Sequence, residues 1–322
     1  MTRPISETRI VVLNYNGKAL LEECLPSIVE AARYARRKTS VTVLDNQSTD
    51  ESIDFLRMNF PDVSIMSAAD NRILFSYNDA LAQMTEPVII LLNNDIRVDK
   101  GFVDPLIDPF ERDEDVFAVG AQCRNFDGQG FQGEKSIGGM RFGLFWTDSR
   151  YSGYEQDKNH PSWTAQVALG AFDRNKFLQL GGYDDLYFPG LWEDTDISFQ
   201  AYRYGWHCLY EPQSILYHRG QVTFHKAYGS SARAVIAYRN TFLFMWKNFS
   251  GIPFILSQLF WVPLRILLAL ARGNKGLLSG FLRAIPIMNK AYSRKMRISL
   301  KLQRTNRDIL AIWGSRNWGI PS

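Results

Sequence analysis

The run VIILLNND at residues 88–95 joins five apolar residues to two asparagines and an aspartate. A short, continuous apolar run is typical of a strand that is covered on both faces of a parallel sheet. The polar residues follow where the strand should end, and ligands of open α/β sheets bind beyond the carboxyl ends of their strands. The stretch therefore predicts a central strand and one edge of a binding site.

Three upstream segments repeat this apolar pattern, at residues 10–13, 41–44 and 63–66. Between the first two, apolar residues from Leu21 to Ala32 recur at helical spacing. Strands that alternate with helices predict a mainly parallel sheet with right-handed crossovers.

Polar clusters follow three of these strands: Asn14-Tyr15-Asn16, Asp45-Asn46 and Asn93-Asn94-Asp95. Asn and Asp also end strands and cap helices where no ligand binds, so each cluster alone says little. Three clusters on the same edge of one sheet predict a ligand site.

The composition is that of a globular protein, with 322 residues, 46% hydrophobic and 22% charged. It excludes a disordered chain, a collagen and a coiled coil. Three cysteines without a CxxC pair exclude a disulfide scaffold and a cysteine-based zinc site. The first residues contain no apolar core of signal-peptide length, so we expect a cytoplasmic protein with free thiols.

Charge is unevenly distributed along the chain. Of the 37 Lys and Arg residues, 16 lie from Lys226 onward, where Asp308 is the only acidic residue. The first 225 residues hold 21 basic and 32 acidic residues. We therefore expect a main domain over residues 1–225 and a basic, apolar helical region over residues 226–322 that seeks an anionic partner.

A second patterned block follows residues 120–165, which are rich in glycine and aromatic residues and predict loops around the site. The block contains Leu169-Gly170-Ala171-Phe172, Gly181-Gly182-Tyr183-Asp184, Trp192-Glu193-Asp194-Thr195-Asp196 and Tyr217-His218-Arg219-Gly220.

In this order, the motifs resemble those of family 2 glycosyltransferases, which are inverting enzymes that use a nucleotide-sugar donor. The resemblance covers residues 10–225, and it rests on the ordered set because each piece alone is weak. The tail is similar to that of bacterial rhamnosyltransferase-like members. The family implies a GT-A (Rossmann-like) fold with a mixed, mainly parallel central sheet and helices on both faces, followed here by a C-terminal helical membrane-associating tail.

The resemblance assigns the donor to the strand ends. Asp45 would accept hydrogen bonds from the base or the ribose, and Tyr15 either packs on the base or only on the protein. The nucleotide-sugar-binding residues that the resemblance implies are Asn14, Tyr15, Asp45, Asn71, Asn78, Asn94, Asp95, Gly170 and Trp192.

The resemblance also implies a divalent metal, Mg²⁺ or Mn²⁺, held by Asp95 and His218. A hard cation prefers oxygen ligands, and the motif Asn93-Asn94-Asp95 has a single carboxylate, so we expect modest metal affinity. Asp194 matches the base that deprotonates the acceptor hydroxyl, with Glu193 as the alternative. Acids at the start of a helix also serve as caps.

One loop departs from the family. The family's nine-position pattern N-x-G-F-x-x-G-x-N corresponds here to the eight residues 71–78, where Asn71 and Asn78 remain but larger residues replace both glycines. Two hypotheses follow: a metal-dependent enzyme that acts on a lipid-linked or surface-polysaccharide acceptor, and a catalytically silent GT-A scaffold that binds glycan or partner proteins at the membrane. A sugar nucleotidyltransferase is less favoured, because a Gly-rich triphosphate loop is missing from the sequence.

Residues 251–272 approach the length of a membrane span, about 20 residues. Arg265 lies inside this run, and Pro253 and Pro263 interrupt it, so we expect helices that lie in the membrane interface. A buried helical pair and a true span are the alternatives. The protein would be peripheral on the inner face of the cell membrane, without a nucleic-acid partner. The basic residues expected near anionic headgroups are Lys247, Arg272, Lys275, Arg283, Lys290, Arg294, Lys295 and Arg297.

Overall fold

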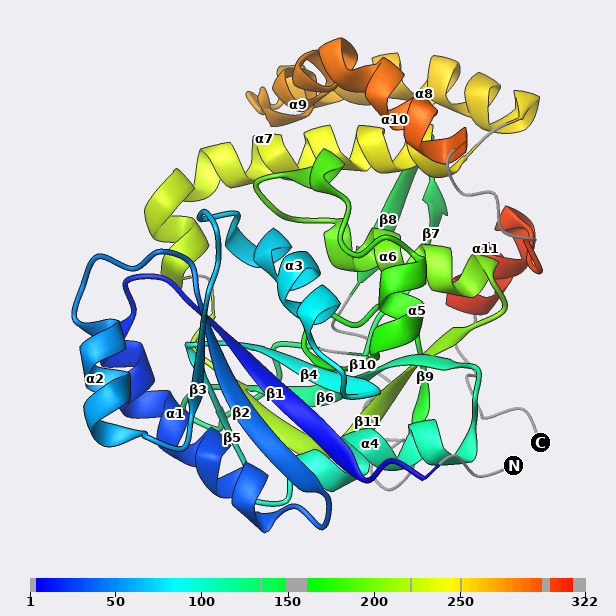
Figure 1. The fold of residues 1–322 in the computed structure, drawn as a ribbon. Helices are drawn as coiled ribbons and strands as arrows, with labels where there is room; N and C mark the ends of the chain where they lie inside the picture. The colour runs from blue at the N-terminus through cyan, green and yellow to red at the C-terminus, as the bar shows by residue number, and fades with distance from the viewer. Residues whose placement is uncertain are drawn as a thin grey trace.

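The computed structural model of the chain describes residues 4–133, 135–148, 161–220, 222–249, 251–296 and 302–314. A twisted central sheet has helices on both faces (Figure 1). Its strands are β1 (Glu7–Asn14), β2 (Lys38–Asp45), β3 (Ser64–Ser67), β4 (Val88–Asn93), β5 (Ile96–Val98), β6 (Val116–Asn125), β9 (Ser162–Thr164), β10 (Gly170–Asp173) and β11 (His207–His218). The strand order is β3-β2-β1-β4-β10-β6-β11-β5, and β9 pairs with β11. β10, β5 and β9 run antiparallel to their neighbours, so the sheet is mixed and mainly parallel, as predicted.

Both faces of the sheet are apolar because successive strand residues point to opposite sides. In β4, Ile89 and Leu91 belong to one core cluster, and Ile90 and Leu92 belong to the other. The continuous apolar run at residues 88–92 therefore forms a strand that is buried on both faces, and the prediction of a central strand is confirmed.

The helices divide between these two cores. α1 and α4 cover one face, whereas α3, α5, α6 and the C-terminal helices lie over the other (Figure 1). Their bounds are α1 (Lys18–Tyr34), α2 (Ser52–Asn59), α3 (Ser76–Gln83), α4 (Val103–Arg112), α5 (Arg174–Gln179), α6 (Glu193–Arg203), α7 (Val222–Asn248), α8 (Ile252–Ala271), α9 (Gly276–Ala284), α10 (Met288–Met296) and α11 (Asn306–Gly314).

The segment predicted as loops contains regular structure. β6 extends to Asn125, and β7 (Ile137–Arg141) pairs with β8 (Leu144–Asp148) in a separate antiparallel hairpin. The loop prediction is therefore wrong for these residues, since the two short strands pack against α7 and α11 and lack a long apolar run. Residues 149–160 lie outside the described residues.

The segment α7 starts close to the boundary predicted near residue 225 and consists of two helices joined by a kink at Gly229, where φ is 70°. The second of these helices enters the core beside α6. Phe242, Phe244, Met245 and Phe249 are buried there. α8 then runs without interruption through Pro263, so the prediction that this proline interrupts the helix is wrong. Figure 1 shows α8, α9 and α10 as the outermost layer, above α7.

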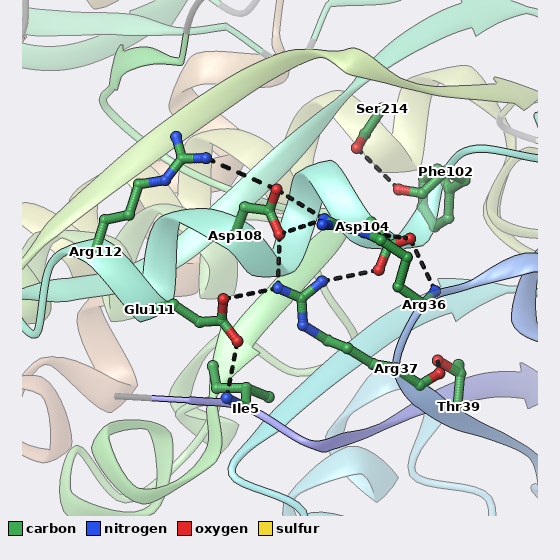
Figure 2. A network of polar contacts seen from close by, with 10 residues as sticks. All are labelled: Ile5, Arg36, Arg37, Thr39, Phe102, Asp104, Asp108, Glu111, Arg112 and Ser214. Carbon is green, nitrogen blue, oxygen red and sulfur yellow. Dashed lines mark hydrogen bonds and ion pairs between the residues drawn. The ribbon is translucent and has the colours of Figure 1, made fainter. Parts of the chain in front are cut away.

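An ion-pair network joins the start of β2 to α4 at the sheet edge opposite the polar strand ends (Figure 2). The guanidinium of Arg37, whose side chain is 9% exposed, lies 2.8 Å from Asp104, 2.6 Å from Asp108 and 2.9 Å from Glu111. The second oxygen of Glu111 accepts a hydrogen bond from the backbone N–H of Ile5. One cation therefore anchors the first strands to α4.

We expect Arg37→Met to destabilise the fold by about 2–4 kcal/mol, because three neighbouring carboxylates lose the cation they share. Urea denaturation measures the loss. Arg33→Met is the matched control: Arg33 pairs with Asp62 with both side chains mostly exposed, so its loss should stay within about 0.5 kcal/mol. Equal losses in the two variants would contradict a structural role for the network.

Candidate active site

The polar strand ends meet at one edge of the sheet, as predicted. Asn14 pairs with Asp45 in the register of β1 and β2, and its Nδ2 lies 3.1 Å from Asp45 Oδ1. Asn94, just after β4, donates from Nδ2 to Asn14 Oδ1 at 2.7 Å. All three side chains are buried, and Ser48 donates to Asp45 through both its N–H and its hydroxyl. The three residues thus form a buried, hydrogen-bonded polar network at the ends of the strands.

The other donor residues from the sequence analysis are spread more widely. Tyr15 follows Asn14 of this network and is 44% exposed, so its ring is open to solvent. Asn71 accepts from the N–H of Ile73, which has a φ of 55° at the position of the first lost glycine. Asn78 exchanges two hydrogen bonds with the backbone of Tyr183 and thereby fastens the 181–183 turn to α3.

The packing of the sheet requires glycine at position 170. It lies in β10 between β4 and β6 with a φ of 149°, where an added Cβ would stand 2.1 Å from the carbonyl oxygen of Val119. Any side chain would separate the strands. Its neighbour Leu169 lines a cavity that His218 and Glu193 also line.

Asp95 and His218 come together because β5 pairs antiparallel with the end of β11. His218 Nε2 lies 3.4 Å from Asp95 Oδ1, and this buried oxygen makes no hydrogen bond within the described chain. Asp95 is 5% exposed. The two atoms face each other at a spacing that suits neighbouring ligands of one cation.

Gln132 holds the histidine ring in one tautomer. Its Nε2 donates to the backbone carbonyl of His218 at 2.7 Å, so its Oε1 must face His218 Nδ1, 3.0 Å away. Nδ1 therefore donates to Gln132, and Nε2 is the ring nitrogen that faces Asp95. Fixing the free nitrogen in this way is how proteins orient metal-binding histidines.

The residues present fit a divalent cation with few protein ligands. The described residues contain no cluster of three or more His, Cys, Asp or Glu side chains that would hold a metal alone. Asp95 and His218 supply one oxygen and one nitrogen, and Mg²⁺ usually keeps waters and substrate phosphates as its remaining ligands. The unpartnered Asp95 oxygen and the oriented histidine nitrogen make this pair the candidate metal centre.

Glu193 and Asp194 begin α6 after a strained turn. Leu191 and Trp192 have φ values of 72° and 81°, a region that costs about 1–3 kcal/mol for residues with side chains. The buried Asn240 of α7 holds the turn by donating from Nδ2 to three carbonyls, including that of Leu191 at 2.7 Å. The backbone of the acidic pair is therefore fixed from α7.

The environments of the two acids differ. Burial, together with the nearby Asp194, raises the pKa of Glu193 to about 8, and its Oε2 has no hydrogen-bond partner in the described chain. Burial also raises the pKa of Asp194, but the backbone N–H of Thr195 donates to its Oδ1 at 2.7 Å and favours the ionised form. The two neighbouring carboxyl groups thus differ: a backbone N–H favours the ionised form of Asp194, whereas Glu193 Oε2 has no such donor in the described chain.

Two cavities meet at this pair. A cavity of about 350 Å³ is lined by Asn93, His218, Glu193 and Asp194, on the side of the strand ends. A second, of about 660 Å³, lies between the β7–β8 hairpin, α7 and α8, and the same two acids line it together with Trp192. The acidic pair therefore has access to a reactant on each side.

Two residues of this site carried no sequence signal, and the signal of a third was misinterpreted. Gln132 and Asn240 are ordinary polar residues in sequence, and their partners lie 86 and about 50 residues away. Lys247 follows the apolar residues 242–246, a pattern that indicates a buried lysine with an acidic partner, but it was interpreted as a contact to lipid headgroups. It is 4% exposed and pairs with Asp184 and Asp196, so its predicted place among lipid headgroups is wrong.

The prediction that Arg294 lies near lipid headgroups is wrong for the same reason, because Arg294 pairs with Asp184 and Asp185. Lys290 lies 3.5 Å from Asp185 as well. Arg272, Lys275 and Arg283 are exposed, whereas Arg297 and the side chain of Lys295 lie outside the described residues.

The chain is similar to known proteins in sequence. The family model described as "Glycosyl transferase family 2" matches residues 9–179. The N-acetylglucosaminyl-diphospho-decaprenol L-rhamnosyltransferase of Mycobacterium tuberculosis (strain CDC 1551 / Oshkosh) is 26% identical over 271 residues, which cover 75% of this chain and 85% of that protein.

Solved structures show the same fold. GalNAc-T7 with UDP, GalNAc and Mn²⁺ gives a TM-score of 0.60 at 16% identity, covering 77% of this chain and 49% of that one. The mannosyltransferase PcManGT from Pyrobaculum calidifontis, in complex with GDP-Man and Mn²⁺, gives 0.54 at 17% identity over 92% and 86%. The fold is GT-A, and both neighbours were solved with a divalent metal. The match over more than half of the chain shows that this protein is a glycosyltransferase and belongs to glycosyl transferase family 2.

Proposed function

We propose that the enzyme transfers a hexosyl or deoxyhexosyl group, with inversion, from a nucleotide-diphosphate sugar to a lipid-linked or surface-polysaccharide acceptor. The observation that carries this proposal is the position of Glu193 and Asp194 between two cavities, one of which also contains His218 beside Asp95. The similarity to a rhamnosyltransferase whose named substrate is diphospho-decaprenol-linked supports a lipid-linked acceptor.

In the proposed reaction, the donor occupies the 350 Å³ cavity and the acceptor enters from the 660 Å³ cavity. Asp194 takes the proton of the acceptor hydroxyl while the sugar develops positive charge, and attack on the face opposite the leaving group inverts the anomeric centre. Neutral Glu193 donates a hydrogen bond to a sugar hydroxyl. A divalent cation bound at Asp95 and His218 would neutralise charge on the departing nucleoside diphosphate.

A screen of nucleotide sugars with Mn²⁺ or Mg²⁺ tests the function. We expect one donor to bind and to release its nucleotide when a prenyl-diphospho-N-acetylglucosamine is added, with mass spectrometry identifying the product. Absence of binding by every nucleoside diphosphate would overturn the proposal. The silent-scaffold alternative predicts binding without turnover, and the intact set of Asp95, His218 and Asp194 favours turnover.

We further propose that the enzyme is peripheral on the inner face of the cell membrane and binds it through α8. Within the described residues, one helix, Ile252–Ala271, is long and apolar enough to cross a bilayer, and 6% of it is buried. Its exposed large side chains form one broad apolar stripe: Ile252, Ile255, Leu256, Leu259, Phe260, Leu264, Leu267, Leu268 and Leu270. Phe254, Val262, Ile266 and Ala269 pack on the protein instead. A helix with one face packed and the other apolar and exposed favours lying in the interface over spanning.

We expect the full chain to sediment with anionic vesicles at low salt more strongly than with neutral ones, since Arg272, Lys275 and Arg283 are exposed around α8. The double variant Leu256→Glu, Leu259→Glu should lose at least about tenfold in vesicle affinity, because both exposed leucines would leave the bilayer. Met58→Glu is the control, since Met58 is 75% exposed on α2. Failure of the wild type to sediment would refute the membrane proposal.

A further inference from the structure

The 660 Å³ cavity contains a feature that the proposed reaction does not use. Three arginines line it: Arg141 at the end of β7, Arg233 on α7 and Arg265 on α8. The acidic side chains in its wall are Glu193 and Asp194. None of the three guanidinium groups has an ion-pair partner among the residues that the structure describes.

The charge of this cavity is therefore positive. Among the described residues that line it, three guanidinium groups outnumber the two carboxyl groups, so the net charge is positive even when both acids are ionised. Arginine matches the geometry of phosphate oxygens through paired N–H donors. Such a wall suits a ligand that carries two negative charges, such as a diphosphate.

The arginines are held in place by close packing between α8 and the hairpin. Arg265 Nη1 donates to the backbone carbonyl of Arg141 at 3.1 Å. Gly143, with a φ of 73°, lets the hairpin turn approach α8, since an added Cβ would stand 2.9 Å from the carbonyl oxygen of Ser257. The Phe142 and Trp261 rings pack with centroids 4.8 Å apart. The cavity wall and the exposed apolar stripe of α8 thus belong to one rigid unit.

We propose that Arg141 and Arg265, with Arg233 at the junction of the two cavities, bind the diphosphate of a lipid-linked acceptor. Its sugar then reaches Asp194, and its lipid chain leaves along the exposed stripe of α8. Arg233 also lines the donor cavity, so Arg141 and Arg265 are the arginines specific to the acceptor. This inference rests on the proposed function and names the chemical group by which the acceptor is recognised.

Direct binding in neutral detergent, without donor, tests the inference. The probes are a short-chain prenyl-diphospho-N-acetylglucosamine and the matching alkyl N-acetylglucosaminide, which lacks the diphosphate. We expect the wild type to prefer the diphosphate probe, and Arg141→Gln and Arg265→Gln each to weaken its binding about tenfold or more, with glycoside binding unchanged. Arg265→Lys should retain part of the preference. Arg272→Gln is the matched control, because Arg272 is exposed just beyond α8 and does not line the cavity.

Two results would overturn the inference. One is equal binding of both probes by the wild type. The other is that Arg141→Gln and Arg265→Gln weaken binding of the diphosphate probe no more than Arg272→Gln does. If the two variants then lose only affinity for anionic vesicles, the arginines bind phospholipid headgroups. Nucleotide-sugar binding is measured separately. Absence of donor binding by the wild type would count against the proposed function. Unchanged donor binding by Arg141→Gln and Arg265→Gln would show that these variants are impaired only in binding the acceptor.

Discussion

Replacement of Asp194 by Asn should lower kcat by about 10²- to 10⁴-fold, because the amide cannot accept the proton of the acceptor hydroxyl. The amide oxygen still accepts the N–H of Thr195, so α6 should begin as in the wild type. Donor affinity should therefore persist. Steady-state kinetics and calorimetric titration of the donor measure the two quantities.

Glu193→Gln is the matched comparison for this variant. Because the pKa of Glu193 is raised to about 8, its carboxyl is mostly protonated at pH 7, and Gln preserves that neutral state. We expect a loss of less than about tenfold. In the wild type, activity should rise with pH as Asp194 ionises and fall near pH 8 as Glu193 loses its proton. Glu193→Gln should remove the alkaline fall and keep the acid limb. A larger loss in Glu193→Gln than in Asp194→Asn would transfer the role of base to Glu193.

The second large effect is expected at the candidate metal centre. Asp95→Asn and His218→Ala should each weaken Mn²⁺-dependent donor binding by about tenfold to a hundredfold, because both side chains face the same space 3.4 Å apart. The double variant should lose less than the product of the two effects, as residues that share one ligand are not additive. Titration of Mn²⁺ and of donor with and without the metal provides the measurement.

Gln132→Leu separates orientation from ligation. It removes the group that fixes the His218 tautomer while leaving both proposed ligands, so metal affinity should fall about tenfold. If His218→Ala leaves the metal dependence unchanged, the histidine is structural and the assignment of ligands is wrong.

Local patterns were sufficient for the parallel strands β1 to β4 and for the edge that bears the site. The apolar run at residues 88–92 identified a doubly buried strand, and Asn14, Asp45 and Asn94 meet because parallel strands end at a common edge. Strand periodicity and strand ends are properties of a few neighbouring residues, so they can be read without the fold. The β7–β8 hairpin was missed because each strand is short and packs through its contacts with α7 and α11.

What the sequence alone determined is thus the four parallel strands β1 to β4, the polar strand ends and the acidic start of α6. Only the tertiary structure decided which of the many polar residues serve them. Lys247 became a buried partner of Asp196 instead of a headgroup contact, Gln132 oriented His218, and Arg141 and Arg265 met in one cavity. Arg141 and Arg265 are 124 residues apart, and their meeting depends on the packing of α8 against the hairpin. Contacts at such separations leave no periodic trace along the chain, because they arise from the free energy of the whole fold.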